Sequence, residues 1–208
     1  MASMVGTVTN QDVARAYGLR AAEYVELFGT IDAAHPDDRQ LIGEWSSTLN
    51  GPVLDVGSGP GQWTDFLVRS GAAAEGIEMV PEFLAHARSR FPTVPFRPGR
   101  LPVLDIPDAY ASGILAWYSL IHTAPDEMPA ALAELARVTR AGGSLLVGFF
   151  EGQRIEAFPH AVVTAYYWPT EELIRRLTDA GFTTSGGWSR REPGVRQQAA
   201  VIAHRRGR

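Results

Sequence analysis

The chain of 208 residues contains no lysine and no cysteine. Because all 19 basic residues are arginine, Schiff-base catalysis on a lysine and phosphate binding by a Walker-type lysine are both excluded. The lack of cysteine excludes disulfides, thiolate nucleophiles and cysteine-bound zinc or iron-sulfur clusters, and it fits a reducing compartment. The five histidines are scattered and no acidic cluster accompanies them, so we expect no metal site.

Long apolar runs are also missing. No stretch approaches the roughly 20 uninterrupted apolar residues of a membrane-spanning helix, and residues 1–10 have neither the basic nor the apolar region of a secretory signal. We therefore expect a soluble, cytoplasmic protein that has no membrane partner. The length suits one domain with a sizeable core.

The net charge of -4 is unevenly distributed. Residues 190–208 hold six arginines against one glutamate, which gives this tail +5 and leaves -9 for the rest. A basic tail can bind nucleic acid, but no aromatic residues are interleaved here, which favours a solvated end. We therefore expect no nucleic-acid partner.

Hydrophobic periodicity predicts alternating helices and strands after an all-helical start. Apolar residues at three- and four-residue steps predict one amphipathic helix over residues 11–28 and a second over 36–49. The predicted strands then span residues 53–56, 73–78, 94–97, 112–117, 144–150, 182–189 and 198–204. The predicted helices between them span residues 64–69, 81–91, 126–140 and 169–181.

This alternation predicts an α/β fold, a doubly wound and largely parallel sheet covered by helices on both faces. The last two strands are expected to pair as a hairpin. Residues 1–50 are interpreted as an N-terminal helical cap that belongs to the same domain, and residues 51–208 as the ligand-binding core.

The most specific motif is the run VLDVGSGPG at residues 53–61, where the first strand turns into a helix. Gly57, Gly59 and Gly61 let the backbone approach a ligand, and free amides at such a turn suit an anionic or strongly polar group. The dinucleotide fingerprint G-x-G-x-x-G would need glycine at position 62, where this chain has Gln62. The motif therefore disfavours NAD.

Two acidic residues accompany the loop. Asp55 would repel a pyrophosphate, but it suits a ligand that carries an ammonium group, such as an amino-acid moiety. Glu78 ends the second strand 21 residues after Gly57, a spacing that places a carboxylate beside the loop to accept hydrogen bonds from ribose hydroxyls. Either acid alone is more often a helix N-cap or a solvated strand end, but together with the loop they favour a ligand site.

Asp55, Gly57, Gly59, Gly61 and Glu78 make the chain resemble the class I S-adenosylmethionine-dependent methyltransferases. The resemblance continues through residues 117–123, 136–138 and 142–143, and it is strongest to small stand-alone members related to quinone-biosynthesis C-methyltransferases. It implies a Rossmann-like seven-stranded sheet in the order 3-2-1-4-5-7-6 with the seventh strand antiparallel. It also implies S-adenosyl-L-methionine as cofactor and S-adenosyl-L-homocysteine as product.

One segment departs from the family pattern. Where many relatives have an acidic residue for the adenine amino group, this chain has Gly99, Arg100 and Leu101. Arginine cannot accept a hydrogen bond, so the adenine would be held by backbone groups there and by packing on Met79. The residues expected to contact the cofactor are Tyr17, Asp55, Gly57, Ser58, Gly59, Gly61, Trp63, Glu78, Met79, Gly99, Arg100, Leu101, Ala116, Trp117 and Tyr118.

Methyl transfer by in-line displacement needs few catalytic side chains, but a hydroxyl or amine acceptor benefits from a base near neutral pKa. His122 follows the fourth predicted strand at the ligand-binding end of the sheet, so it is the candidate base or acceptor-positioning residue; the alternative is a structural histidine. Residues 151–168 form an unusually long connection and are interpreted as a wall of the acceptor site, with His160, Tyr167 and Trp168 facing the substrate.

These features predict an enzyme that transfers a methyl group from S-adenosylmethionine to a small, aromatic or otherwise hydrophobic acceptor. The alternatives are a non-catalytic protein that binds S-adenosylmethionine or a nucleotide, and an RNA methyltransferase. The acceptor, the atom that is methylated, and the choice between monomer and homodimer are not readable from the sequence.

Overall fold

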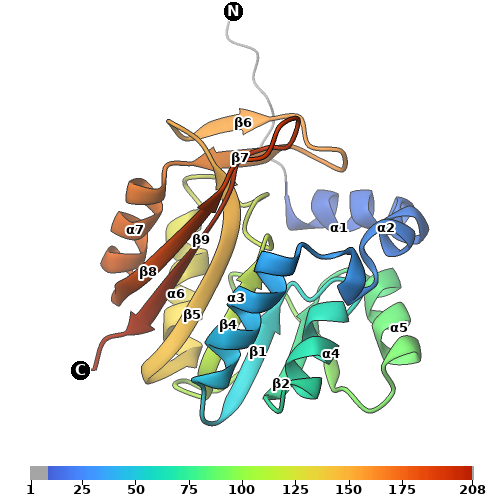
Figure 1. Cartoon of the computed structure of the whole chain (residues 1–208), viewed down its shortest axis with the longest axis horizontal. Helices are drawn as coiled ribbons and strands as arrows, with labels where there is room; N and C mark the ends of the chain where they lie inside the picture. Colours follow the sequence, from blue (N-terminus) through green and yellow to red (C-terminus); the bar gives the residue numbers. More distant parts are fainter. Residues whose placement is uncertain (1–8, 208) are drawn as a thin grey trace, which may run out of the picture.

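The computed structural model describes residues 9–207, folded around one sheet with helices on both faces (Figure 1). The strands are β1 (Pro52–Val56), β2 (Ala73–Glu78), β3 (Phe96–Pro98), β4 (Ala111–Trp117), β5 (Thr139–Glu151), β6 (Glu156–Phe158), β7 (Ala165–Trp168), β8 (Phe182–Arg190) and β9 (Gln198–Arg205). The helices are α1 (Asn10–Leu19), α2 (Ala21–Phe28), the short 3-10 helix η1 (Ile31–Ala33), α3 (Pro36–Ser47), α4 (Gln62–Arg69), α5 (Pro81–Arg90), α6 (Met128–Val138) and α7 (Thr170–Asp179).

The main sheet has the predicted topology. Strands β3, β2, β1, β4 and β5 are neighbours in that order and run parallel. β9 pairs antiparallel with β5, and β8 pairs antiparallel with β9. Because β8 and β9 are the sixth and seventh predicted strands, the order 3-2-1-4-5-7-6 with an antiparallel seventh strand is confirmed, as is the terminal hairpin.

Two short strands, β6 and β7, were not predicted. They form an antiparallel hairpin within residues 151–168, and β7 pairs with β5 only at Phe150 and Glu151. β4 has already ended at Trp117, paired with Gly148, so the hairpin continues the sheet on the β4 side, beyond the carboxyl end of that strand. In Figure 1 it lies across the top of the sheet, where open α/β sheets bind their ligands.

Apolar side chains cover the two faces of the sheet in separate clusters. Leu132 and Leu135 of α6 pack with Leu177 of α7 on one face, and Ile42 and Trp45 of α3 pack with α4 on the other. The indole Nε1 of Trp45 donates to Ser144 Oγ on β5 at 2.9 Å, so the buried polar atom is satisfied. These clusters fix the ends of the strands from which the loops of the site leave.

The predicted single helix over residues 11–28 is two helices. Arg20 leaves the helical region with φ -116° and ψ 14°, which turns α2 away from α1. Tyr17 and Tyr24 then pack on Phe83 of α5; their ring centroids lie 5.8 and 5.1 Å, respectively, from the ring centroid of Phe83. We call α1 and α2 the cap. α3 packs on the sheet instead, although it lies within the residues 1–50 that were predicted as a helical cap. Residues 1–8 lie outside the described part of the chain.

The arginine-rich tail folds back onto the protein. Arg190 binds Asp38 on α3, and Arg205 donates to the carbonyl oxygens of Ala136 and Gly181. These two arginines therefore fasten β8 and β9 to the neighbouring helices, whereas Arg191, Arg196 and Arg206 are exposed. Arg208 lies outside the described residues. Among residues 9–207, no helix is long and apolar enough to cross a membrane.

Candidate active site

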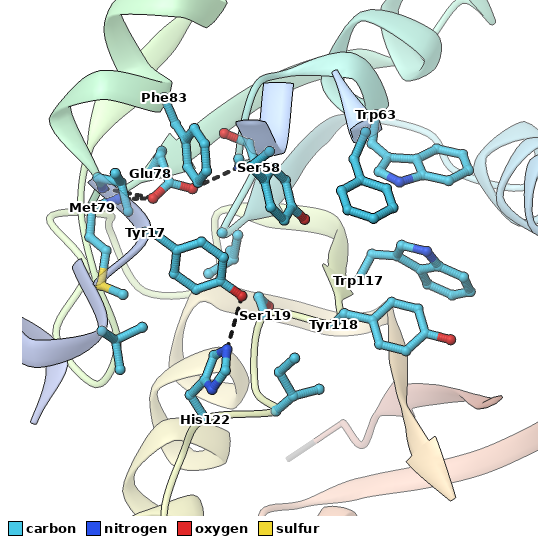
Figure 2. Close-up of a pocket in the computed structure, with 18 of the residues that line it drawn as sticks. Tyr17, Ser58, Trp63, Glu78, Met79, Phe83, Trp117, Tyr118, Ser119 and His122 are labelled. Carbon is cyan, nitrogen blue, oxygen red and sulfur yellow. Dashed lines mark hydrogen bonds between the residues drawn. The ribbon is translucent and has the colours of Figure 1, made fainter. Parts of the chain in front are cut away.

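A cavity of about 920 Å³ opens at the carboxyl ends of the parallel strands. Its walls come from the glycine loop, the ends of β2 and β4, the cap and the β6–β7 hairpin. Figure 2 shows Glu78 and Met79 at one side of it, Tyr17 and His122 in the middle and Trp117 at the other side. The volume is at the upper end of the range of small-molecule sites.

The glycines of the loop have different roles. Gly57, Gly59 and Gly61 all have positive φ, at 77°, 56° and 92°, which favours glycine. A Cβ at Gly57 would lie 2.4 Å from the Cβ of Ser119, whereas one at Gly59 would meet nothing within 4 Å. Gly57 therefore permits close packing of the loops after β1 and β4. Gly61 instead packs against Phe96 and does not line the cavity, so its predicted contact with a ligand is not supported.

Glu78 is held in place by the backbone. Its Oε1 accepts hydrogen bonds from the N–H groups of Met79 and Val80, and its Oε2 accepts one from Gly59, all at 2.7 Å. The residue is only 5% exposed; burial raises the pKa of its carboxyl, and the three N–H groups oppose that rise. Since a carboxylate has about four acceptor positions, one on Oε2 remains for a ligand hydroxyl at the cavity wall.

Asp55 does not line the cavity. Its Oδ2 accepts a 2.7 Å hydrogen bond from the hydroxyl of Thr64 behind the loop, and burial raises the pKa of its carboxyl to about 7. The predicted contact with a ligand ammonium group is therefore not supported, because the β1 side chain points toward α4. Ala116 is likewise part of the apolar core of the sheet and does not line the cavity. Both residues support the cavity wall without contacting the cavity.

His122 lies at the centre of a hydrogen-bonded chain. Its Nδ1 is 2.7 Å from the carbonyl oxygen of Thr164, which can only accept, so Nδ1 carries the proton. Its Nε2 then accepts a 2.9 Å hydrogen bond from the Tyr17 hydroxyl (Figure 2). Burial lowers the pKa of the imidazole, so the ring is neutral at pH 7. Tyr17, predicted to reach the cofactor carboxylate, lines the cavity with its hydroxyl committed to His122.

Aromatic and imidazole rings follow one another around the cavity. Neighbouring ring centroids along this series lie 5.1 to 6.2 Å apart. We call the series the aromatic arc; its members are Trp63, Trp117, Tyr118, Phe150, His160, His122 and Tyr17. The arc offers a flat ligand several ring edges and faces, because aromatic pairs favour tilted or offset contact.

Two predicted substrate residues lie elsewhere. Trp168 is 1% exposed in the core, under the guanidinium group of Arg176 at 5.3 Å. Tyr167 stacks on Phe158 with ring centroids 4.2 Å apart. Successive residues of a strand point to opposite faces. Tyr167 and Trp168 therefore lie on opposite faces of β7, and neither side chain lines the cavity. The prediction that they contact the substrate is therefore not supported, whereas His160 lines the cavity.

Sequence reasoning missed the end of the cavity where Asp38 and Arg190 meet. Arg190 Nη1 donates to Asp38 Oδ1 at 2.9 Å, Arg190 Nε lies 3.1 Å from Glu192 Oε1, and the guanidinium group lies 4.7 Å from the Trp188 ring centroid. Gln198 lines the same end. Asp38 and Arg190 are 152 residues apart, and no motif marks either of them. Tyr24 of the cap also lines the cavity; its seven-residue spacing from Tyr17 was the one available signal.

Four buried polar atoms on the cavity wall have no hydrogen-bond partner within the described residues. They are Ser58 Oγ, Gln62 Oε1, Tyr118 OH and Ser119 Oγ. Buried polar groups are normally paired, so these four atoms indicate a polar ligand. No group of three or more histidine, aspartate or glutamate side chains among residues 9–207 could hold a metal ion.

Residues 53–143, from β1 into β5, match the family model of the methyltransferase domain. The chain carries a methyltransferase domain. Its sequence is 32% identical over 155 residues to malonyl-[acyl-carrier protein] O-methyltransferase of Serratia marcescens, covering 70% of this chain and 55% of that protein. It is 36% identical over 112 residues to demethylmenaquinone methyltransferase of Tropheryma whipplei, covering 51% and 45%. The chain thus spans about half the length of these curated relatives.

The methyltransferase domain also has close structural neighbours. The 1,6-didemethyltoxoflavin-N1-methyltransferase of Burkholderia thailandensis, solved with 1,6-didemethyltoxoflavin and S-adenosylhomocysteine, superposes with a TM-score of 0.77. The match covers 100% of this chain and 93% of that one at 19% identity. It shows that this chain has the fold of that methyltransferase.

Proposed function

We propose that this protein is an S-adenosylmethionine-dependent methyltransferase that acts on a small aromatic or hydrophobic acceptor. The observation that carries the proposal is one cavity that joins the glycine loop, the backbone-held Glu78 and four unpaired buried polar atoms. The relatives differ in the acceptors given by their names, so the acceptor is argued from the cavity itself.

The residues present fit the cofactor. Glu78 keeps one acceptor position on Oε2 for a ribose hydroxyl, and the open space at Gly59 lets a ligand approach the loop backbone. Met79 and Leu101 line the same side of the cavity and would pack on the adenine. Bound there, S-adenosylmethionine supplies a sulfonium methyl group for in-line displacement. The aromatic arc beside it can stabilise a cation.

His122 and Tyr17 provide a route for a proton. If the acceptor reacts through a hydroxyl, its proton passes to the Tyr17 oxygen while the Tyr17 proton passes to His122 Nε2. The Nδ1–H of His122 remains hydrogen-bonded to the carbonyl oxygen of Thr164 throughout, and this hydrogen bond stabilises the resulting imidazolium ion. This route keeps His122 as the base and makes Tyr17 the group that touches the acceptor.

Calorimetric titration of the purified protein with S-adenosylmethionine, S-adenosylhomocysteine and NADH, each alone, tests the cofactor assignment. We expect micromolar binding of the first two and none of NADH, because Gln62 replaces the last fingerprint glycine. Binding of NADH alone would overturn the proposal. Binding of both S-adenosyl compounds without turnover on any compound of a phenol and amine library would instead indicate a non-catalytic binding protein.

The proton route is tested with His122→Ala and Tyr17→Phe on the acceptor that such a library yields. We expect kcat to fall about 100-fold for His122→Ala and by a smaller factor for Tyr17→Phe, with unchanged S-adenosylhomocysteine affinity. His86→Ala on α5 is the matched control and should keep the wild-type kcat. Equal rates for His122→Ala and wild type would reduce His122 to a structural residue.

A further inference from the structure

We propose that the acceptor is an uncharged planar aromatic molecule whose oxygen accepts a hydrogen bond from the Tyr118 hydroxyl, at the end of the cavity near Asp38 and Arg190. This inference rests on the proposed function and adds the charge and the polar contact of the acceptor. It makes Tyr118 a specificity-determining residue.

The hydroxyl of Tyr118 has no hydrogen-bond partner among the described residues. The residue has φ 55°, a strained conformation for an aromatic residue, and such strain concentrates at functional sites. Its hydroxyl is buried and makes no hydrogen bond within the described residues. In Figure 2 this hydroxyl points away from Glu78 and His122, so it serves the opposite end of the cavity from the ribose site.

The hydroxyl remains a donor at any physiological pH. Burial, followed by the negative charge of Asp38, raises the pKa of Tyr118 well above its usual value. A protonated phenol that lacks a partner is best satisfied by an oxygen or nitrogen lone pair of the ligand. The acceptor is therefore expected to present such an atom here.

The charges around the cavity disfavour an anionic acceptor. Five carboxylates and three guanidinium groups line it: Glu23, Asp38, Glu78, Asp126 and Glu127 against Arg20, Arg100 and Arg190. Arg20 is paired with Glu23 and Arg190 with Asp38 and Glu192. Arg100 lies beside Leu101, at the adenine side of the cavity.

His160 and His122 add no positive charge at pH 7, since burial lowers the pKa of His160 to about 4 and also lowers that of His122. A carboxylate on the acceptor would therefore lose its hydration against an excess of negative charge, with no arginine at this end left to pair with it among the described residues. A neutral ring loses no such hydration and packs on the aromatic arc.

Three naphthalene probes of the same shape test this inference on protein saturated with S-adenosylhomocysteine: 2-naphthol, naphthalene and 2-naphthoate. We expect 2-naphthol to bind about 10-fold more tightly than naphthalene, as one buried hydrogen bond allows, and 2-naphthoate to bind most weakly. Tyr118→Phe keeps the ring and removes the hydroxyl, so it should bring 2-naphthol to the affinity of naphthalene. Tyr110→Phe, at an exposed tyrosine, should change nothing.

The possible outcomes separate the two proposals. If S-adenosylhomocysteine does not bind, the proposed function fails. If it binds but 2-naphthoate binds best, or none of the probes binds, or Tyr118→Phe leaves the probe order unchanged, only the acceptor inference fails. A loss of S-adenosylhomocysteine affinity in Tyr118→Phe would assign Tyr118 to the cofactor and would also overturn the inference.

Discussion

The two ends of the cavity are built in different ways. At the Glu78 end, the backbone N–H groups of Gly59, Met79 and Val80 hold the carboxylate, and one stretch of chain from β1 to the start of α5 supplies them. At the Tyr118 end, side chains from α3, β4, β5, the β6–β7 hairpin and β8 form the surface. A backbone-built surface depends on few residue identities, whereas a side-chain surface can change with each substitution while the fold persists.

The first prediction concerns the largest effect and isolates the Glu78 end. Glu78→Ala removes an acceptor from three backbone N–H groups and from the ligand hydroxyl, so we expect S-adenosylhomocysteine affinity to fall at least about 100-fold, since hydrogen bonds to a charged group are worth about 1.5–3 kcal/mol each. Calorimetry measures the loss. Glu82→Gln, at an exposed position of the following helix, is the control.

Binding of 2-naphthol to the Glu78→Ala protein tests whether the two ends of the cavity act independently. If the two ends are separate, 2-naphthol still binds to the Glu78→Ala protein. Its affinity falls only by the part that contact with bound S-adenosylhomocysteine contributes. Unchanged S-adenosylhomocysteine affinity in Glu78→Ala would show that the ribose assignment is wrong.

The second prediction separates two glycines of the same loop. Gly57→Ala adds a Cβ 2.4 Å from Ser119 Cβ as well as backbone strain, so we expect a loss of about 3 kcal/mol in the free energy of unfolding. Gly59→Ala adds strain alone, and about 1 kcal/mol is expected. Urea denaturation measures both losses.

Ser119→Gly provides the rescue for the second prediction. It removes the side chain that the new methyl group would meet, so Gly57→Ala combined with Ser119→Gly should recover the steric part of the loss and keep the part due to strain. Equal losses for the two single glycine variants would contradict the close-packing argument.

The third prediction has the smallest effect and concerns the Tyr118 end. Burial lowers the pKa of His160 to about 4, below its value in the unfolded chain, so the unfolded state binds more protons between pH 6.5 and 4. Stability therefore falls as the pH falls through this window. His160→Gln should remove part of the loss in the free energy of unfolding between pH 7 and 5. The part removed is expected to be below about 1 kcal/mol, because the ring is half-exposed and solvent screens its charge.

Urea denaturation at pH 7 and pH 5 measures this difference. His204→Gln makes the same chemical change on β9, away from the cavity, and should lose as much stability as wild type. An identical loss for His160→Gln and wild type would mean that His160 is not buried as described.

The same contrast explains how far sequence reasoning reached. The β1 loop, Glu78 and β2 were predicted because the signals are local: glycines at fixed spacing and a carboxylate at the end of a strand. The β6–β7 hairpin was not, because strands of three and four residues are too short to show a period of two. The pairing of Asp38 with Arg190 was missed because a charged residue in a sequence does not identify its partner 152 positions away.

The side-chain orientations were the least predictable part. Asp55, Tyr167 and Trp168 have residue types that suit a site, yet each points away from the cavity. Helix starts were easier, since Pro36 and Pro81 stand at first helical positions, where proline is favoured. The break at Arg20 follows from packing of the cap on α5 and has no local signal.

The shallow attachment of the β6–β7 hairpin has an evolutionary consequence. It joins the sheet only at Phe150 and Glu151, while the strands that carry the fold pair along most of their lengths. Insertions, deletions or exchange of this hairpin therefore leave the main strand pairings of the sheet intact while they replace one wall of the cavity. A lineage built on this scaffold can reshape the Tyr118 end of the cavity by altering one hairpin, while the Glu78 end stays as it is.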